Sequence, residues 1–164
     1  MKSQPLSQTT SRYLPLITLS LWISILLHVI YHYSDLPSLI PTHYTLAGIP
    51  DDLGPKLTLV YLCLVGLLVT VMLAAIPRYP QFYNLPYSID PTKRTQVLLV
   101  LRQMTETLNA WVAVLFLLLI GGTVQIGMQK WNRLPFAALP LLCVILVSVL
   151  AYYSYRLWQY RSMK

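Results

Sequence analysis

Charge is the scarcest property of this sequence. Asp, Glu, Lys and Arg make up only 10% of the 164 residues, and just five residues are acidic. A soluble domain carries about 25% charged residues, so this chain has too few to cover a surface that faces water. Hydrophobic residues instead make up 56% of the chain, and the mean hydropathy is +0.59. This balance predicts an integral membrane protein.

Cysteines and catalytic patterns are also scarce. The chain has two cysteines, Cys63 and Cys143, and both fall in apolar segments, where a free thiol usually packs as a small apolar side chain. Two such residues exclude a disulfide framework and a zinc motif. A Ser-His-Asp set and a glycine-rich phosphate loop are missing from the sequence as well. We therefore predict no catalytic residue, no enzymatic activity and no cofactor, apart from the metal or haem alternative described below.

Four apolar segments have the length of about 20 residues that a membrane span needs. They predict one membrane domain over residues 1–164, with helices at about 14–33, 57–76, 92–128 and 134–158, a cap loop at 34–56 and a cytoplasmic loop at 77–91. The first span follows a polar, basic start and lacks a small-residue cleavage site, which indicates a retained signal anchor. The predicted fold class is an all-α integral membrane protein, a four-transmembrane-helix bundle with a proline-rich extracytoplasmic cap loop.

The basic residues predict the orientation of these spans. With the N-terminus in the cytoplasm, nine of the 12 Lys and Arg residues fall in cytoplasmic segments, and Lys56, Lys130 and Arg133 fall outside. This asymmetry predicts that both termini are cytoplasmic. We expect the protein in the bacterial cytoplasmic (inner) membrane or an equivalent energy-transducing membrane. Because the cations are spread over helix ends and not gathered on one soluble face, we expect no nucleic-acid partner.

The cytoplasmic connector changes character part-way along its length. Its prolines predict an irregular backbone through the first half, because proline lacks an N–H donor and restricts the residue before it. Asp90 fits an N-cap and Pro91 the first helical position, so we expect a helix to begin within about two residues of Pro91. The charged side chains that follow predict a cytoplasmic contact surface for anionic headgroups or a partner, made of Lys93, Arg94, Arg102 and Glu106.

Two groups of polar residues lie within the predicted spans, where burial in lipid is costly. His28 and His32 are four residues apart, a spacing that fits either metal or haem ligation or an interfacial packing pair. Arg102, Glu106 and Asn109 form a polar stripe at the cytoplasmic mouth of the third span. The spacing of Arg102 and Glu106 fits a local ion pair, and the alternative is a proton or substrate pathway.

The cap loop has the most distinctive composition in the chain. The stretch LPSLIPTHYTLAGIPDDLGPK, residues 36–56, holds four prolines, two glycines, one of the three histidines and two of the five acidic residues. Glycine permits turns that side chains obstruct, and proline removes the entropy that opposes ordering. We therefore expect a compact, largely irregular cap over the helix ends. The residues that give it this structure are Pro37, Pro41, Gly48, Pro50 and Gly54.

Structure alone does not explain the cap's ionisable side chains, namely His43, Asp51, Asp52 and Lys56. A histidine in such a cap needs a polar partner, so we expect His43 to bond Asp51, Asp52 or a backbone carbonyl. Two interpretations follow. The group either locks the loop onto itself, or binds a peptide, toxin or lipid headgroup.

The same stretch resembles the signature of the SdpI-type bacterial membrane proteins. The matching elements, in chain order, are Leu36-Pro37, Ile40-Pro41, His43, Gly48, Pro50-Asp51, Gly54 and Lys56. They stand in the domain of unknown function that opens the SdpI immunity proteins, which are longer and have more spans. The resemblance implies a role in immunity or signalling, in which a producer cell is protected against its own secreted toxin.

Two functional hypotheses follow from these observations. The first is a non-enzymatic immunity or signalling protein whose cap recognises a peptide, toxin or lipid. The second is an accessory or structural subunit of a larger membrane complex, and a small transporter is a weaker third. The expected partners are the lipid bilayer, other membrane subunits or further copies of the chain, and a peptide ligand.

Overall fold

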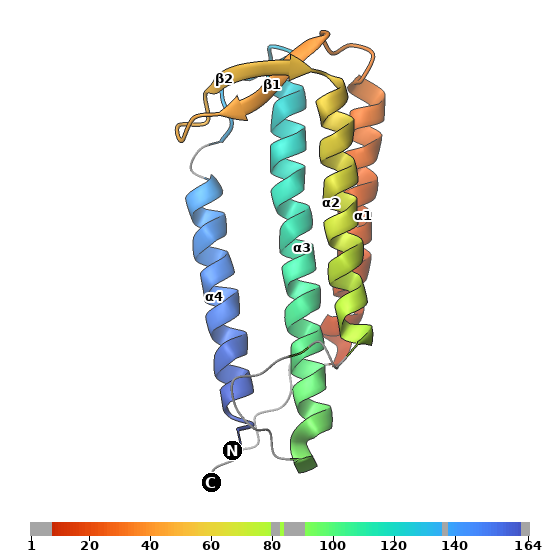
Figure 1. Cartoon of the computed structure of the whole chain (residues 1–164), viewed down its shortest axis with the longest axis vertical. Coiled ribbons are helices and arrows are strands. Elements are labelled where there is room, and N and C mark those ends of the chain that lie inside the picture. Colours follow the sequence, from red (N-terminus) through yellow and green to blue (C-terminus); the bar gives the residue numbers. More distant parts are fainter. Residues whose placement is uncertain (1–7, 80–82, 84–90, 136–137, 162–164) are drawn as a thin grey trace.

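The computed structural model describes residues 8–79, 83, 91–135 and 138–161, and within them the chain is mostly helical. In chain order the elements are α1 (Gln8–His32), β1 (Leu39–Tyr44), β2 (Pro50–Pro55), α2 (Leu57–Ala75), the 3-10 turns η1 (Ile76–Arg78) and η3 (Pro91–Lys93), α3 (Arg94–Gly127) and α4 (Ala138–Trp158). The long helices lie side by side, and the two strands β1 and β2 lie across one end of them (Figure 1).

The helices have the length and apolar character required to cross a membrane. In the described part of the chain there are four such segments, Tyr13–His32, Leu57–Arg78, Arg94–Gly127 and Pro140–Trp158. Their outward faces carry large apolar side chains, which lipid solvates as readily as a protein core does. The prediction of four helices long and apolar enough to span a membrane is therefore confirmed.

Helix α3 lies at the centre of the bundle and contacts α1, α2, α4 and β1. Its side chains Ala113, Ile120 and Val124 are fully buried. The main apolar core lies where α1, α2 and the hairpin meet α3, and a second core joins the start of α3 to the end of α4 through Val97, Val100, Leu101, Tyr153 and Leu157. One long helix thus connects the two ends of the molecule.

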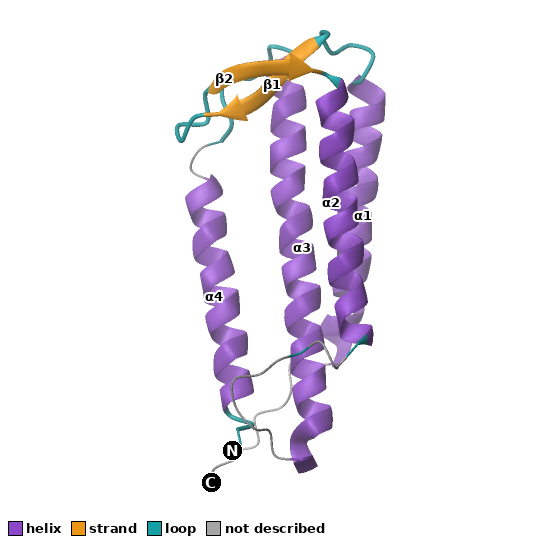
Figure 2. Cartoon of the chain, viewed as in Figure 1, coloured by secondary structure: helices purple, strands orange, loops and turns teal. Residues whose placement is uncertain are grey.

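Residues 36–56 correct the expectation of an all-α chain with a largely irregular cap. Figure 2 shows β1 and β2 as a hairpin at the end of the helices. The strands are antiparallel, and their register pairs Ile40 with Gly54 and His43 with Asp52. A strand in a two-stranded sheet has one outward edge, where a proline without an N–H is tolerated. The register also shifts on both sides of His43. These features let a proline-rich segment pair as strands.

The helix limits also differ from those expected from apolar runs. Helix α1 begins at Gln8 and not near residue 14, because the helix continues into the polar residues that precede the apolar run. Helix α4 begins at Ala138 and not at 134, because the backbone N–H of Leu134 donates to Gly48 O of the hairpin at 2.8 Å. Helical structure begins at Pro91 with η3, while Asp90 and most of the preceding connector lie outside the described residues.

Candidate functional site

The hairpin is fixed to the end of α3 by apolar packing and one hydrogen bond. Leu36 and Ile40 are buried beside Gly127, where an added Cβ would lie 2.9 Å from Leu36 Cδ2. Tyr44 Oη and Thr123 Oγ1 are 2.8 Å apart. Burial raises the pKa of the Tyr44 hydroxyl above its ordinary value, and the hydrogen bond to Thr123 partly offsets this. Strand β1 is therefore held as a fixed platform.

The turn of the hairpin is fixed to the segment between α3 and α4. Gly48 has a φ of +73°, a left-handed conformation that favours glycine. Its N–H donates to Thr45 O, and its carbonyl accepts from the N–H of Leu134. The glycine predicted to permit a turn thus also links the hairpin to the α3–α4 segment.

Lys56 stabilises the end of α1. Its Nζ donates to Tyr33 O at 3.1 Å and to Leu36 O at 3.3 Å, and it lies 4.8 Å from the centroid of the Tyr33 ring. A lysine that donates to the last carbonyls of a helix also offsets the negative end of the helix dipole. These contacts give Lys56 a structural role in the hairpin base.

His43 and Asp51 form the polar pair at the centre of the candidate site. His43 Nδ1 lies 2.6 Å from Asp51 Oδ1 across the two strands, so the expected contact is present. The side chains are 69% and 40% exposed, although we expected His43 to lose much of its hydration. Ion pairs this exposed add only about 0–1 kcal/mol to stability. The pair therefore contributes little to the stability of the hairpin.

Asp52 adds a second carboxylate on the same strand as Asp51. Its Oδ1 accepts from the N–H of Leu53 at 2.8 Å, and the residue is exposed. The hairpin also exposes apolar side chains that we did not predict as site residues: Leu39, Leu46, Ile49 and Leu53. Burial along β1 does not alternate, because Leu39 is exposed while Ile40 and Pro41 are both buried, so no period-two pattern in the sequence marked these apolar side chains. We call the exposed set His43, Asp51, Asp52, Leu39, Leu46, Ile49 and Leu53 the hairpin surface.

His28 and His32 contact each other at the hairpin end of α1. Their ring centroids are 4.7 Å apart in an edge-to-face arrangement. Within the described residues, no group of three His, Cys, Asp or Glu side chains lies close enough to hold a metal ion. A zinc site takes at least three protein ligands. The contact fits a packing pair, and ligation of metal or haem stays a prediction.

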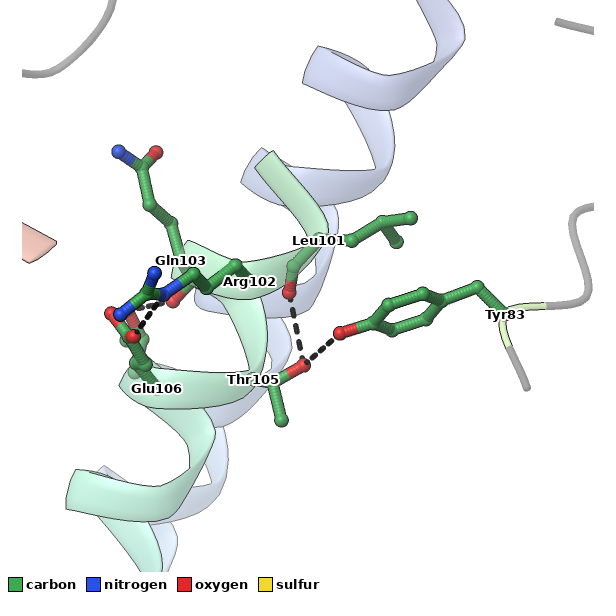
Figure 3. A network of polar contacts seen from close by, with 7 residues as sticks. Tyr83, Leu101, Arg102, Gln103, Thr105 and Glu106 are labelled. Atoms are coloured by element: carbon green, nitrogen blue, oxygen red, sulfur yellow. Dashed lines mark hydrogen bonds and ion pairs between the residues drawn. The ribbon is translucent and has the colours of Figure 1, made fainter. Parts of the chain in front are cut away.

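The charged residues predicted as a cytoplasmic contact surface lie at the start of α3, far from the hairpin. Lys93 ends η3 and Arg94 begins α3. Arg102 Nε donates to Glu106 Oε1 at 2.7 Å, the ion pair expected from their spacing. In Figure 3 this pair projects to one side of α3, and Thr105 contacts Tyr83 on the other. The structure separates this group from the hairpin surface.

Residues 19–69 match the family described as Domain of unknown function (DUF1648). The DUF1648 match runs from the middle of α1 through the hairpin into α2, so it includes the whole hairpin surface. This domain is found in SdpI-type proteins. No curated protein and no solved structure gives a significant match to the chain. The DUF1648 match supports a membrane protein and assigns no activity to it.

Proposed function

We propose that this is a non-enzymatic membrane protein related to SdpI-type immunity and signalling proteins, and that its hairpin surface recognises a cationic, partly apolar peptide. The observation that carries the proposal is the His43–Asp51 pair, which is exposed on a hairpin whose backbone is fixed to α3 and to the α3–α4 segment. An exposed polar pair on a rigid platform contributes little to stability but is well placed for binding.

Charge favours a cationic peptide over an anionic lipid headgroup. The hairpin surface carries two carboxylates, while Lys56 is engaged with the carbonyls at the end of α1. In the neutral imidazole, Nδ1–H donates to Asp51 and leaves Nε2 as an acceptor for a ligand N–H. Leu46, 91% exposed, and Leu53, 58% exposed, offer apolar contact beside these acceptors. Acceptors and apolar side chains together match a peptide with Lys or Arg among apolar residues.

We expect Asp51→Asn to weaken peptide binding about tenfold or more, because a charge-assisted hydrogen bond contributes about 1.5–3 kcal/mol. The probe is a synthetic peptide of alternating Lys and Leu, titrated onto detergent-solubilised protein by calorimetry. The melting temperature should stay within about one degree, since the exposed pair adds little stability. Asp35→Asn is the matched control, because Asp35 is an exposed carboxylate outside the hairpin.

The opposite result would support the interpretation in which His43 and Asp51 only lock the hairpin onto itself. If Asp51→Asn and His43→Ala lower the melting temperature and leave peptide binding unchanged, the hairpin surface is structural. The accessory-subunit alternative predicts stable co-purification with larger membrane proteins in mild detergent, and no binding of the peptide by the isolated chain.

The proposal requires the hairpin to face outward. In a background with Cys63→Ala and Cys143→Ala, a cysteine in place of Leu46 should react with a membrane-impermeant maleimide in intact cells. A cysteine added after Lys164 should react only after the cells are opened, because the positive-inside asymmetry predicts that both termini are cytoplasmic. Labelling of the C-terminal cysteine in intact cells would reverse the predicted orientation and exclude an external ligand for the hairpin.

A further inference from the structure

A pocket lies at the end of the bundle opposite the hairpin, between α1, the end of α2 with η1, and α3. Its volume is about 360 Å³, and its lining includes Thr18, Pro77, Arg78, Arg102, Glu106 and Asn109. Volumes of this size are typical of sites for small ligands. The sequence predicted the polar stripe of Arg102, Glu106 and Asn109 on α3. The folded chain adds Arg78 from η1 and Thr18 from α1 to the same pocket lining.

The pocket lies at the depth of the lipid headgroups. At 1.5 Å per residue, the stretch of α3 from Glu106 to Gly127 spans about 32 Å, close to the thickness of the hydrocarbon core. Arg102 therefore lies just beyond the hydrocarbon when the hairpin end of α3 reaches the other surface. Arg78 follows the last apolar turn of α2 and lines the same pocket. A headgroup can reach this pocket from the plane of the membrane.

The charged lining favours a ligand with one negative charge. Arg78 and Arg102 contribute two positive charges, and Glu106 contributes one negative charge. The Glu106 side chain is only 11% exposed, whereas that of Arg102 is 57% exposed. Arginine carries five N–H donors and binds phosphate through its planar guanidinium. The net positive charge matches a phosphodiester, which carries a single negative charge.

Asn109 contributes a buried acceptor that lacks a donor. The residue is 7% exposed, and its Nδ2 donates to Thr70 O at 3.2 Å. That bond fixes the orientation of the amide. Asn109 Oδ1 then has no hydrogen-bond partner among the described residues. A buried acceptor of this kind is costly unless a donor reaches it, and the hydroxyl of a polyol headgroup would be such a donor.

We propose that this pocket binds a phosphodiester with an attached hydroxyl group, in the form of the headgroup of an anionic phospholipid. Arg78 and Arg102 hold the phosphate, and Asn109 Oδ1 accepts from the headgroup hydroxyl. Pro77 and Leu73, which also line the pocket, contact the glycerol backbone of the lipid, on the side of its acyl chains. This site is separate from the hairpin surface and does not depend on the peptide ligand proposed above.

Native mass spectrometry of the detergent-solubilised full chain tests the proposal with short-chain phosphatidylglycerol as the probe. Arg102→Gln and Arg78→Gln should each weaken binding about fivefold, the scale of one cation beside an anionic membrane surface. Glu106→Gln should strengthen binding by a similar factor, because it frees Arg102 and removes a negative charge. Arg161→Gln is the matched control, because Arg161 is exposed, follows α4 at the same end of the bundle and lies outside the pocket lining, so this variant should leave binding unchanged.

Three comparisons decide the outcome. Phosphatidylcholine of the same chain length should bind at least fivefold more weakly, since its headgroup has no net charge and no hydroxyl. Glycerophosphoglycerol, which is phosphatidylglycerol without its acyl chains, is the soluble phosphodiester with the same chemistry. If it binds as strongly as the lipid, the ligand is a soluble ester and not a lipid. Equal binding of phosphatidylglycerol by Arg102→Gln, Glu106→Gln and the unmodified chain would overturn the proposal, whatever happens to their melting temperatures.

Discussion

Gly66→Ala is expected to lower the free energy of unfolding by about 1–3 kcal/mol, the usual cost of overpacking a tight core. A Cβ at Gly66 would lie 2.4 Å from Trp22 Cη2 and 2.7 Å from Phe116 Cδ1. Both neighbours are aromatic rings, packed with their centroids 5.6 Å apart, so neither can move aside as the end of a flexible chain would. At Gly66, α2 therefore lies directly against side chains of both α1 and α3.

The Trp22 indole has little freedom to give way. Its Nε1 donates to Thr70 Oγ1 at 2.8 Å, one turn along α2 from Gly66. The added methyl must therefore push α2 away from both rings or break this hydrogen bond. Either movement separates α2 from the helices that it contacts, and membrane helices depend on such close packing for their association.

Gly121→Ala provides the matched control for this substitution. Gly121 is also a helical glycine, but a Cβ there would meet nothing within 4 Å. Gly121→Ala should therefore leave the free energy of unfolding unchanged, or raise it by up to about 1 kcal/mol because alanine has a higher helix propensity than glycine. Thermal unfolding of both variants in the same detergent makes the comparison. Equal melting temperatures for the two variants would show that the contact between Trp22, Gly66 and Phe116 is not tightly packed.

Gly48→Ala is expected to cost about 1.5–3.5 kcal/mol and to detach the hairpin turn from the α3–α4 segment. At a φ of +73° the left-handed conformation costs any L-residue about 1–2 kcal/mol. The new Cβ would also lie 2.8 Å from the backbone oxygen of Leu134, which cannot rotate away. The N–H of Leu134 then loses its acceptor, Gly48 O, which adds about 0.5–1.5 kcal/mol.

Hydrogen exchange locates this effect, because the amide of Leu134 should exchange much faster in Gly48→Ala than in the unmodified chain. Ala47→Ser is the control, since Ala47 is an exposed neighbour in the same turn. Gly48→Asn separates the two causes: asparagine tolerates the left-handed conformation but still carries a Cβ. A Leu134 amide that stays protected in Gly48→Ala would show that the turn accommodates the added Cβ, and the predicted loss of the hydrogen bond would be wrong.

The two substitutions also bear on the proposed recognition role. Gly66 lies in the middle of the bundle, whereas Gly48 lies in the turn of the hairpin. If the hairpin surface binds peptide as a fixed platform, Gly48→Ala should weaken binding at temperatures where the helices are intact. Gly66→Ala should affect binding only where it unfolds the protein. If the hairpin does not need to be fixed in order to bind, both folded variants should bind the peptide equally well.

The sequence by itself determined the helices, because their signal is local. A run of about 20 apolar residues is enough to predict a span, and Pro91 marked the start of the turn η3, which leads into α3, through its own fixed φ. The ion pair of Arg102 with Glu106 was predictable for the same reason, since residues four apart on a helix are neighbours. The sequence also predicted a polar partner for His43 within the cap, but left Asp51, Asp52 and a backbone carbonyl open, and the structure shows that the partner is Asp51.

Only the tertiary structure decided what residues 36–56 become. Strand pairing depends on which backbone groups meet across the hairpin, and the local pattern of prolines indicated irregular structure instead. The docking of β1 relies on Gly127 and Thr123, more than 70 residues further along the chain. The pocket is non-local in the same way, because Arg78 and Thr18 reach Arg102 and Asn109 only when three helices pack together. Contacts between residues so distant in the chain leave no periodic pattern in either segment.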